Sequence, residues 1–509
     1  MSAAHPDRVL DVRRFSFAFE EVWQLQELTF HVNRGEMLLL SGASGTGKST
    51  LALCINGLYP EAVEGQTEGS ILLNGRCVQD MPKGQAAAEA GVVFQDPESQ
   101  FCMMKVEDEL AFVLENQAVP QKEMDQRITD VLTQLGISSL RHREIHTLSG
   151  GEKQKTAAAA VLLMEPDLLI LDEPTANLDP VSAAAFAETI HALKEDHAIL
   201  LIEHQPDAWL PYLDRVCLLD TRGGIRLEGK PETVFSDERL RQEGVYLPAR
   251  YTPLPPQAAP PVSGPDVLEL QAVSAFRSDT PILSDINLRI QAGTCTALTG
   301  QNGAGKSTLL QVISALLPKA AGRVMFLGQE VTAWQEAELR RKTGYVFQQP
   351  EHQFITDTVK EELTFSPMLN GHPDPDAHAA GMMQRFGLEH HGEANPFTLS
   401  GGQKRRLSTA VMLDETPELL LLDEPTFGQD AASTTRLMED LHQLQQQGTA
   451  VLLITHDMRL VHEWCSRVIV LHDGSIAFDG SPAVLWREQE LLQQARLLAP
   501  EGRKEKRYG

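Results

Sequence analysis

Three short motifs occur twice in this 509-residue chain, each time in the same order. The pairs are Gly42 to Thr50 (GASGTGKST) with Gly300 to Thr308 (GQNGAGKST), Leu148 to Glu152 with Leu399 to Gln403, and Asp172-Glu173 with Asp423-Glu424. The separations are 258, 251 and 251 residues. Solenoid repeats are far shorter, about 20 to 45 residues, so this period indicates a duplicated domain. The chain is therefore expected to fold as two similar domains.

A proline-rich segment separates the two copies. Seven prolines fall in the eighteen positions from Pro248 to Pro265, and such a stretch is expected to run extended. An ordered loop over the surface of the first domain is the alternative. The predicted organisation is a first domain at 1–245, a linker at 246–265, a second domain at 266–490 and a C-terminal tail at 491–509.

Composition narrows the class of protein. Acidic residues outnumber basic ones by 70 to 44, giving a net charge of −26, which disfavours binding to nucleic-acid phosphates. The apolar runs are of strand length, far below the roughly 20 residues of a membrane-spanning helix, and the start carries no apolar signal segment. Six cysteines without a CxxC pair suggest reduced thiols. A cytoplasmic protein that reaches a membrane only through partners is expected.

The pattern of apolar runs predicts an α/β fold. Short runs such as 37–40, 168–171 and 199–202 are typical of buried parallel strands, and corresponding runs occur in the second copy. Between Gln95 and Ser149, and between Gln348 and Ser400, the pattern becomes helical and amphipathic. We expect two tandem P-loop NTPase domains, each with a mixed or parallel sheet core and a helical subdomain.

The GxxxxGK[ST] motif predicts a phosphate-binding loop, because its glycines let backbone N–H groups converge on an anion at a helix N-terminus. Lys48 and Lys306 are expected to reach the β- and γ-phosphates, and Ser49 and Ser307 to bind Mg²⁺. The residues expected to hold ATP in this loop are Gly42, Ser44, Gly45, Gly47, Lys48, Ser49 and Thr50, and in the second copy Gly300, Asn302, Gly303, Gly305, Lys306, Ser307 and Thr308.

An acidic pair follows an apolar strand in each copy, 23 residues after the serine of Leu-Ser-Gly-Gly. Asp172 and Asp423 are placed to hold Mg²⁺, as a carboxylate at a strand end commonly does in nucleotide hydrolases. Glu173 and Glu424 are placed to act as general bases on the attacking water. The matched repetition favours catalysis over an ordinary strand terminus.

With the Leu-Ser-Gly-Gly signature added, nearly the whole chain resembles the ATP-binding cassette (ABC) ATPases. The resemblance implies that the signature serves ATP bound to the other domain, so that the domains form an internal pseudo-dimer with two sites. It assigns Gln95 and Gln348 to Mg²⁺, His204 and His456 to the γ-phosphate, and Phe19 to adenine, with Phe276 or Arg277 as the counterpart. The implied signature residues are Ser149, Gly150 and Gly151, and Ser400, Gly401 and Gly402.

The segment after each glutamine narrows the resemblance. Residues 93–112 and 346–365 align without gaps and agree at eleven of twenty positions. Their Gln-x-Pro-Glu-x-Gln-Phe form resembles the energy-coupling factor ATPases, which drive vitamin and metal-ion importers. The implied partners are a transmembrane T-component and a substrate-binding S-component, at the cytoplasmic face of the membrane. Phe101 and Phe354 are predicted to contact the T-component.

Three other classes are compared with this interpretation. Monosaccharide-importer ATPases share the tandem length, but their second copy usually has eroded motifs, whereas both copies are intact in this chain. Translation-factor cassette proteins carry a long charged helical arm between domains, and repair ATPases carry zinc-binding cysteine pairs. Neither feature is present in this sequence.

The two predicted sites are not identical. Glu152 stands where Gln403 stands in the other signature, Glu203 precedes His204 where Thr455 precedes His456, and the D-loops differ (177–179 against 427–430). A carboxylate at Glu152 is expected to weaken ATP binding at the site that this signature serves. Both sites are predicted to hydrolyse ATP, at unequal rates.

Overall fold

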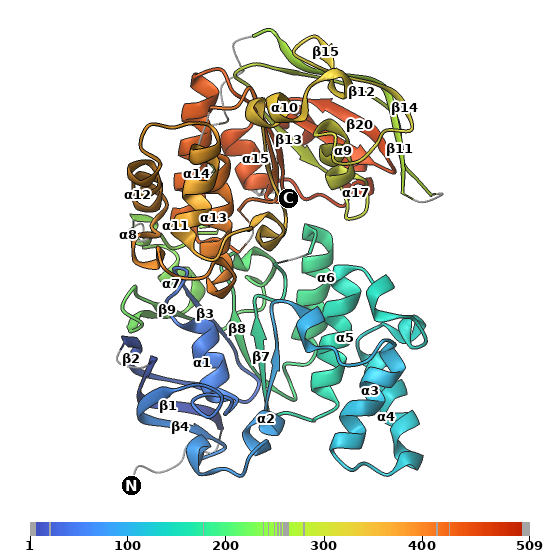
Figure 1. Cartoon of the computed structure of the whole chain (residues 1–509). Helices are drawn as coiled ribbons and strands as arrows, with labels where there is room; N and C mark the ends of the chain where they lie inside the picture. The colour runs from blue at the N-terminus through green and yellow to red at the C-terminus, as the bar shows by residue number, and fades with distance from the viewer. Residues whose placement is uncertain are drawn as a thin grey trace, which may run out of the picture. The chain divides into compact units, whose positions relative to one another are not determined.

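The computed structural model describes residues 7–19, 22–176, 178–237, 239–242, 244–248, 250–251, 254, 257, 264–277, 280–413, 416–426 and 428–500. Two compact units divide the chain, with the change from one to the other near residue 252. Each unit repeats the same succession of strands and helices (Figure 1). The predicted duplication of an α/β domain is confirmed.

A four-stranded antiparallel sheet opens the first unit, in the order β2-β1-β4-β5. Strand β2 alternates between buried and exposed residues over much of its length, as expected for an antiparallel sheet covered on one side, whereas β1 is buried over longer runs. The strands are β1 (Arg8–Phe19), β2 (Val22–Asn33), β4 (Gly65–Leu73) and β5 (Arg76–Cys77).

A six-stranded sheet forms the centre of the first unit, in the order β10-β9-β3-β8-β7-β6. All pairs are parallel except β10 with β9, and strands β3, β6, β7 and β8 are buried along their whole length. The strands are β3 (Met37–Gly42), β6 (Ala90–Val93), β7 (Leu168–Asp172), β8 (Ala198–Ile202), β9 (Arg215–Leu219) and β10 (Ile225–Gly229). Continuous apolar runs form these strands because both faces of the sheet are covered.

Helices cover this sheet, and two further helices form the inserted subdomain. The covering helices are α1 (Lys48–Ile55), α2 (Gln85–Glu89), α5 (Gly150–Leu162), α6 (Pro180–His191), α7 (Pro231–Val234) and α8 (Arg239–Gln242). The subdomain contains α3 (Val106–Asn116) and α4 (Gln121–Gln134), whose apolar faces join the same core as α5 and α6. The helical subdomain expected between Gln95 and Ser149 is therefore present.

The second unit repeats both sheets, in the orders β12-β11-β14-β15 and β16-β17-β18-β13-β19-β20. Its strands are β11 (Asp266–Arg277), β12 (Thr280–Gln291), β13 (Cys295–Thr299), β14 (Ala321–Phe326), β15 (Gln329–Glu330), β16 (Thr343–Val346), β17 (Leu419–Asp423), β18 (Ala450–Ile454), β19 (Arg467–His472) and β20 (Ser475–Gly480). Its helices are α9 (Lys306–Ile313), α10 (Glu336–Lys342), α11 (Val359–Leu369), α12 (Pro375–Phe386), α13 (Gly401–Met412), α14 (Ala431–Gln446), α15 (Met458–Trp464), α16 (Pro482–Leu485) and α17 (Gln489–Gln494). Helices α11 and α12 form the second subdomain.

The folded part of each unit continues past the predicted domain limits. Leu247, two residues beyond the limit at 245, is buried in the first core. Helix α17 crosses the limit at residue 490, and Leu492 and Leu497 are buried in the second core. Apolar side chains just outside the motif-bearing region complete these cores, so residues 491–497 belong to the second domain. Most of the predicted linker and residues 501–509 of the predicted tail lie outside the described residues.

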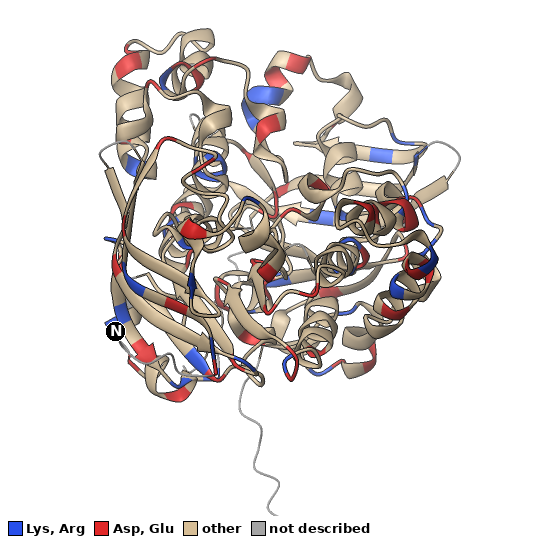
Figure 2. Cartoon of the chain, turned by 90° about the horizontal axis from the view of Figure 1, so that it is seen from below, with Lys and Arg blue, Asp and Glu red and all other residues tan. Residues whose placement is uncertain are grey.

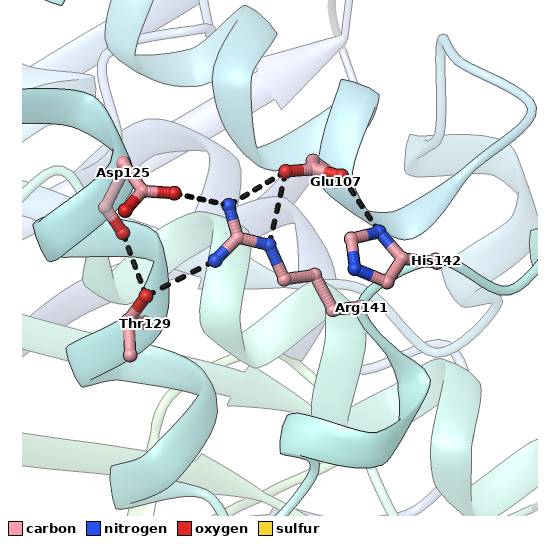
Figure 3. A network of polar contacts seen from close by, with 5 residues as sticks. All are labelled: Glu107, Asp125, Thr129, Arg141 and His142. Atoms are coloured by element: carbon pink, nitrogen blue, oxygen red, sulfur yellow. Dashed lines mark hydrogen bonds and ion pairs between the residues drawn. The ribbon is translucent and has the colours of Figure 1, made fainter.

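A polar network joins the two helices of the first subdomain (Figure 3). The guanidinium of Arg141 lies 2.6 Å from a carboxylate oxygen of Glu107 on α3 and 2.6 Å from one of Asp125 on α4. It also donates to the Thr129 hydroxyl, and His142 lies 2.8 Å from Glu107. In the second subdomain a direct ion pair between Lys360 on α11 and Asp376 on α12, at 2.8 Å, joins the corresponding helices.

Charged residues of both signs are interspersed along the helices and strands, with the acidic ones more numerous (Figure 2). Within the described part of the chain, no helix is both long and apolar enough to cross a lipid bilayer.

Candidate active site

The predicted site residues converge because they follow neighbouring parallel strands. In the first unit β3 leads into the phosphate loop, β8 into His204, β7 into Asp172-Glu173 and β6 into Gln95. In the second unit β13, β18, β17 and β16 carry the corresponding residues. Since parallel strands end at the same edge of a sheet, each unit gathers one complete set of these groups at that edge.

Glycine is required at the start of each phosphate loop. Gly42 has φ +149°, and a Cβ there would stand 2.7 Å from the carbonyl oxygen of Leu219 on β9. The equivalent Cβ at Gly300 would stand 2.1 Å from the carbonyl oxygen of Leu471 on β19. Next to them, Gly45 and Gly303 have positive φ and open space around them, as a loop that wraps a phosphate needs.

The loop lysine of each unit is buried and bonded to its own loop. Lys48 Nζ donates to the carbonyl oxygens of Gly42 at 3.0 Å and Ala43 at 2.8 Å. Lys306 Nζ makes the equivalent bonds to Gly300 at 2.8 Å and Gln301 at 3.0 Å. Burial lowers the pKa of Lys48 to about 8, although Glu173 and Asp172 oppose this shift. An anionic phosphate in the loop would stabilise the charged ammonium.

The strand-end aspartates pair with the loop serines. Burial raises the pKa of Asp172 to about 6, even though the Ser49 hydroxyl donates to its carboxylate. Asp423 and Ser307 repeat the arrangement, and burial raises the pKa of Asp423 to about 6 as well. A hydroxyl beside a carboxylate fits Mg²⁺, which takes few protein ligands and completes its shell with water and phosphate oxygens. Among the described residues no cluster of three or more His, Cys, Asp or Glu side chains could hold a metal by itself.

The candidate bases Glu173 and Glu424 have unusual backbone conformations. Their φ angles are +46° and +50°, in the left-handed region that residues other than glycine rarely adopt. The N–H of Glu173 donates to the Ile202 carbonyl at 2.9 Å, and that of Glu424 to the Ile454 carbonyl at 3.1 Å, so the neighbouring strand holds both turns. Such outliers concentrate at functional sites, and this one occurs in both copies.

A histidine faces each of these glutamates. His204 Nε2 lies 3.1 Å from Glu173 Oε1, and His456 Nε2 lies 3.2 Å from Glu424 Oε1. Burial by itself would raise the pKa of Glu173, but the bond with His204 and the charges of His204 and Lys48 outweigh it and hold the pKa below its ordinary value. The pKa of Glu424 is lowered in the same way against burial. Both glutamates are therefore ionised near neutral pH, as a general base requires.

The predicted glutamines differ between the units. Gln95 Nε2 donates to Glu173 Oε2 at 2.7 Å. Gln348 is exposed, and in the described part of the chain its side chain makes no hydrogen bond to Glu424. Instead, Arg405 from α13 donates to the Glu424 carbonyl oxygen at 3.0 Å. Burial lowers the pKa of Arg405 to about 10, and Gln154 stands at its position in α5.

The signature serines begin helices. Ser149 and Ser400 are the N-caps of α5 and α13, each in a capping box with the residue three positions later. In the first unit that residue is Glu152, whose carboxylate accepts from the Ser149 hydroxyl at 2.9 Å and lies 3.5 Å from Arg143. The negative charge predicted to weaken ATP binding is thus partly offset by a guanidinium that the sequence pattern did not reveal.

Strand register assigns the counterpart of Phe19. Phe19 ends β1 and pairs with Val22, whereas Arg277 ends β11 and pairs with Thr280. Arg277, rather than Phe276, therefore occupies the equivalent position. Phe19 is partly buried beside Phe17 and Tyr59, while Arg277 is exposed. The D-loop positions Asn177 and Phe427 lie outside the described residues.

Sequence reasoning noted Glu203 as a difference between the copies but assigned it no structural role. Its side chain is 3% exposed, and Thr175 donates to it through both its N–H and its hydroxyl. Burial raises the pKa of Glu203 to about 8 despite these bonds, and the charge of Glu173 adds to the shift. An apolar strand followed by one acidic residue and a histidine is the signal in the sequence, but burial of the carboxyl depends on the fold.

The raised pKa of Glu203 makes the stability of the folded chain depend on pH. Because the folded-state pKa of Glu203 lies above its unfolded value of about 4.3, the folded chain holds a proton that the unfolded chain releases, and stability falls as pH rises from about 5 to 8. Glu203→Gln removes this contribution. We expect the melting temperature of the variant, relative to that of the wild type, to rise as the pH is raised from 5.5 to 8.5. A difference in melting temperature that stays constant over this pH range would contradict the prediction. The exposed Glu188→Gln serves as the control.

Known proteins compare with the chain as follows. The sequence profile of the ABC transporter family matches residues 25–176 and 283–427. A protein of Bacillus subtilis (strain 168) named "Putative HMP/thiamine import ATP-binding protein YkoD" is 44% identical over 97% of this chain and 95% of its own length. An ABC transporter ATP-binding protein of Methanosarcina acetivorans is 33% identical over 97% of this chain and 89% of its own length.

The chain belongs to the ABC transporter family, and it is an ATPase with two ATP-binding domains in tandem. A solved archaeal ribosome recycling factor, aABCE1 in complex with the stalk protein aP1, has the same fold, with a TM-score of 0.63 over 95% of this chain and 92% of its own. At 18% identity this similarity concerns the fold alone.

Proposed function

We propose that the chain is the ATP-hydrolysing subunit of an importer of energy-coupling factor type, which takes up HMP or thiamine. The observation that carries this proposal is the 44% identity, over nearly the full length of both chains, to a relative whose name assigns it HMP/thiamine import. Two complete sets of site residues support hydrolysis at both sites. Accumulation of labelled thiamine or HMP by vesicles that contain the chain with its membrane partners tests the solute.

In this proposal each domain binds one Mg-ATP with its own loop, aspartate and glutamine. Glu173 and Glu424 take the proton of the attacking water, and His204 and His456 orient these carboxylates and contact the γ-phosphate. The signature residues of each domain complete the site of the other, as in the family. Phe19 stacks on adenine in the first domain, and Arg277 can do so in the second because a guanidinium plane also stacks on aromatic rings.

The two phenylalanines predicted to contact the T-component differ in their exposure. Phe354 is buried in the second core, in contact with Phe397, and Phe101 packs against the first core. Burial leaves Phe354 little surface for a partner, whereas Phe101 is only partly buried, so the contact of these two residues with the T-component stays a prediction. Several apolar side chains in the same two subdomain regions are exposed, namely Met103, Met104, Ile355, Phe365, Met368, Leu369 and Phe397.

These residues lie in the helical subdomains, and most belong to the second. Phe365, Met368 and Leu369 occupy the last two turns of α11, with 43%, 65% and 69% of their surface exposed. Clusters of exposed apolar side chains commonly mark protein contact sites. We propose that a transmembrane partner covers them and that the peripheral location of the chain at the cytoplasmic face depends on this contact.

We expect the double variant Phe365→Asp/Leu369→Asp to lose membrane partners while the purified chain keeps its basal ATPase rate. Placing carboxylates in an apolar contact costs several kcal/mol unless they are paired. The measurement is co-purification from detergent-solubilised membranes with identification of the bound proteins by mass spectrometry. Leu316→Asp, at an exposed leucine outside the subdomain, is the matched control.

Equal recovery of membrane proteins with the double variant and the wild type would refute this surface. Loss of partners with Leu316→Asp as well would show that the effect is not specific to α11. If the wild-type chain itself brings down no membrane protein, the proposed role as an importer subunit fails.

A further inference from the structure

A buried carboxyl connects three segments of the candidate site in the first unit. Glu203 lies between β8 and His204, and its carboxyl accepts from the Thr175 N–H at 3.2 Å, from the Thr175 hydroxyl and from the backbone N–H of His204. Its own carbonyl oxygen accepts from the Ser41 hydroxyl at 2.9 Å, on the strand that enters the phosphate loop. Thr175 follows Glu173 by two residues, so one side chain joins the turn of the candidate base to the backbone of the candidate histidine.

A tryptophan extends this set of bonds. Trp209 Nε1 donates to the Thr175 hydroxyl oxygen at 3.3 Å, and an indole N–H can only donate. The hydroxyl has one hydrogen and two acceptor lone pairs, so it can accept from Trp209 while it donates to Glu203. Trp209 is fully buried and packs edge-on against Phe186 at 6.1 Å between ring centroids. The hydrogen bonds that lead from Trp209 through Thr175 to Glu203 therefore begin at a side chain packed in the core against α6.

The second unit lacks this connection among its described residues. Thr455 replaces Glu203, and its hydroxyl accepts from the N–H of Asp457, within its own turn. Val461 stands five residues after His456, where Trp209 stands after His204. The hydroxyl of Thr299, at the position of Ser41, is buried and has no hydrogen-bond partner among the residues that the structure describes. Both copies share the bond from the neighbouring strand, and the second copy adds the bond from Arg405 to the Glu424 carbonyl oxygen.

We propose that Glu203 is a positioning residue for ATP hydrolysis in the first domain, holding Glu173 and His204 in the arrangement that activates water. It acts through the Thr175 and His204 backbones. Glu173 sits in a strained left-handed conformation, and a turn of that kind persists only when the surroundings over-determine it. The inference rests on the proposed catalytic roles of Glu173 and His204.

Removing the carboxyl leaves two backbone donors and one hydroxyl donor without their acceptor in a partly buried position. Such unsatisfied groups are costly, so the turn is expected to relax toward other acceptors or water and to displace Glu173. A glutamine keeps one acceptor oxygen at nearly the same place. An alanine keeps none, and Thr175→Val removes the hydroxyl while retaining its volume and the N–H.

The experiment measures kcat and KM for ATP in the full chain. We expect Glu203→Ala to lower kcat by about fivefold to tenfold with KM changed by less than about twofold, because the phosphate loop is intact. Glu203→Gln should restore most of kcat. Thr175→Val should lower kcat in the same direction, and its combination with Glu203→Ala should add little, since both break the same connection. Thr455→Val, the matched variant of the second domain, should change kcat by less than about twofold.

Two single-site backgrounds separate positioning from general stability. In chains that carry Glu424→Gln, the remaining hydrolysis depends on Glu173, and Glu203→Ala should reduce it further. In chains that carry Glu173→Gln, Glu203→Ala should leave the remaining rate unchanged at a temperature well below its melting point. If neither background retains measurable turnover, the proposal is tested by the kcat and KM values of the Glu203 variants in the chain that keeps both glutamates.

Unchanged kcat in Glu203→Ala, or a glutamine variant as slow as the alanine variant, would overturn the proposal. Equal losses in the two single-site backgrounds would show a role in stability only, which also overturns it. If Glu173 and His204 do not have the proposed catalytic roles, the variants Glu173→Gln and His204→Ala will keep full ATPase activity, and this result is distinct from those above.

Discussion

A chain that carries both Glu173→Gln and Glu424→Gln should bind ATP normally and hydrolyse it at least about 10²-fold more slowly, since a positioned base commonly contributes a factor of 10² to 10⁴. The amide keeps the shape of the carboxylate, so neither left-handed turn needs to move. Loss of two negative charges beside the phosphates favours ATP binding, and the dissociation constant should stay equal or fall. Nucleotide binding and phosphate release, measured on the same preparation, test both parts.

The duplicated fold offers a matched control for this pair. Glu188 and Glu439 lie at equivalent exposed positions of α6 and α14, the helices that follow the two candidate bases. Replacing both with glutamine removes the same charge and should leave the rate within about twofold, because exposed charges contribute little at a distance. A double variant at Glu173 and Glu424 that retained a tenth of the wild-type rate would exclude these residues as the bases.

Gly300→Ala should destabilise the second domain by about 3 kcal/mol and abolish its nucleotide binding. The new Cβ would stand 2.1 Å from the Leu471 carbonyl oxygen, which is backbone and cannot swing away as a flexible side chain could. Relief requires β13 to move from β19, and the phosphate loop begins at the end of β13. The contact at Gly42 is longer, 2.7 Å, so Gly42→Ala should cost less.

Thermal unfolding and binding of a fluorescent ATP analogue measure these two effects. Gly381→Ala is the control, because this glycine lies in the middle of α12 on its exposed face, with open space around it. Alanine there should stabilise the helix by about 0.5 to 1 kcal/mol. If Gly300→Ala melted with the wild type, the close approach of β13 and β19 would not limit this position.

The sequence was sufficient to predict the paired domains, the helical subdomains and the groups gathered at the edge of each sheet. These features depend on short motifs that follow apolar strands, and parallel strands bring such motifs together regardless of the intervening chain. The placement of Lys48, Asp172, Glu173 and His204 is of this kind.

Other features depend on side chains that no local pattern connects. Burial of the Glu203 carboxyl requires Thr175 and Trp209, which come from two different loops. The position of Arg277 follows from strand register, which the motifs left open by one residue. Phe101 and Phe354 repeat in both copies, and repetition does not distinguish a packed aromatic residue from a docking one. Exposure decides between the two, and it is a property of the folded chain.

The network around Arg141 has a consequence for how the two halves of this gene can exchange segments (Figure 3). In the first half α3 carries Glu107 and a cation comes from Arg141, whereas in the second half α11 itself carries the cation, Lys360. Recombination that moved α3 into the second half would set Glu107 opposite Asp376. The reverse exchange would set Lys360 beside Arg141. Either hybrid places like charges together, so selection should act against short exchanges within this region, and the two halves are free to diverge after duplication.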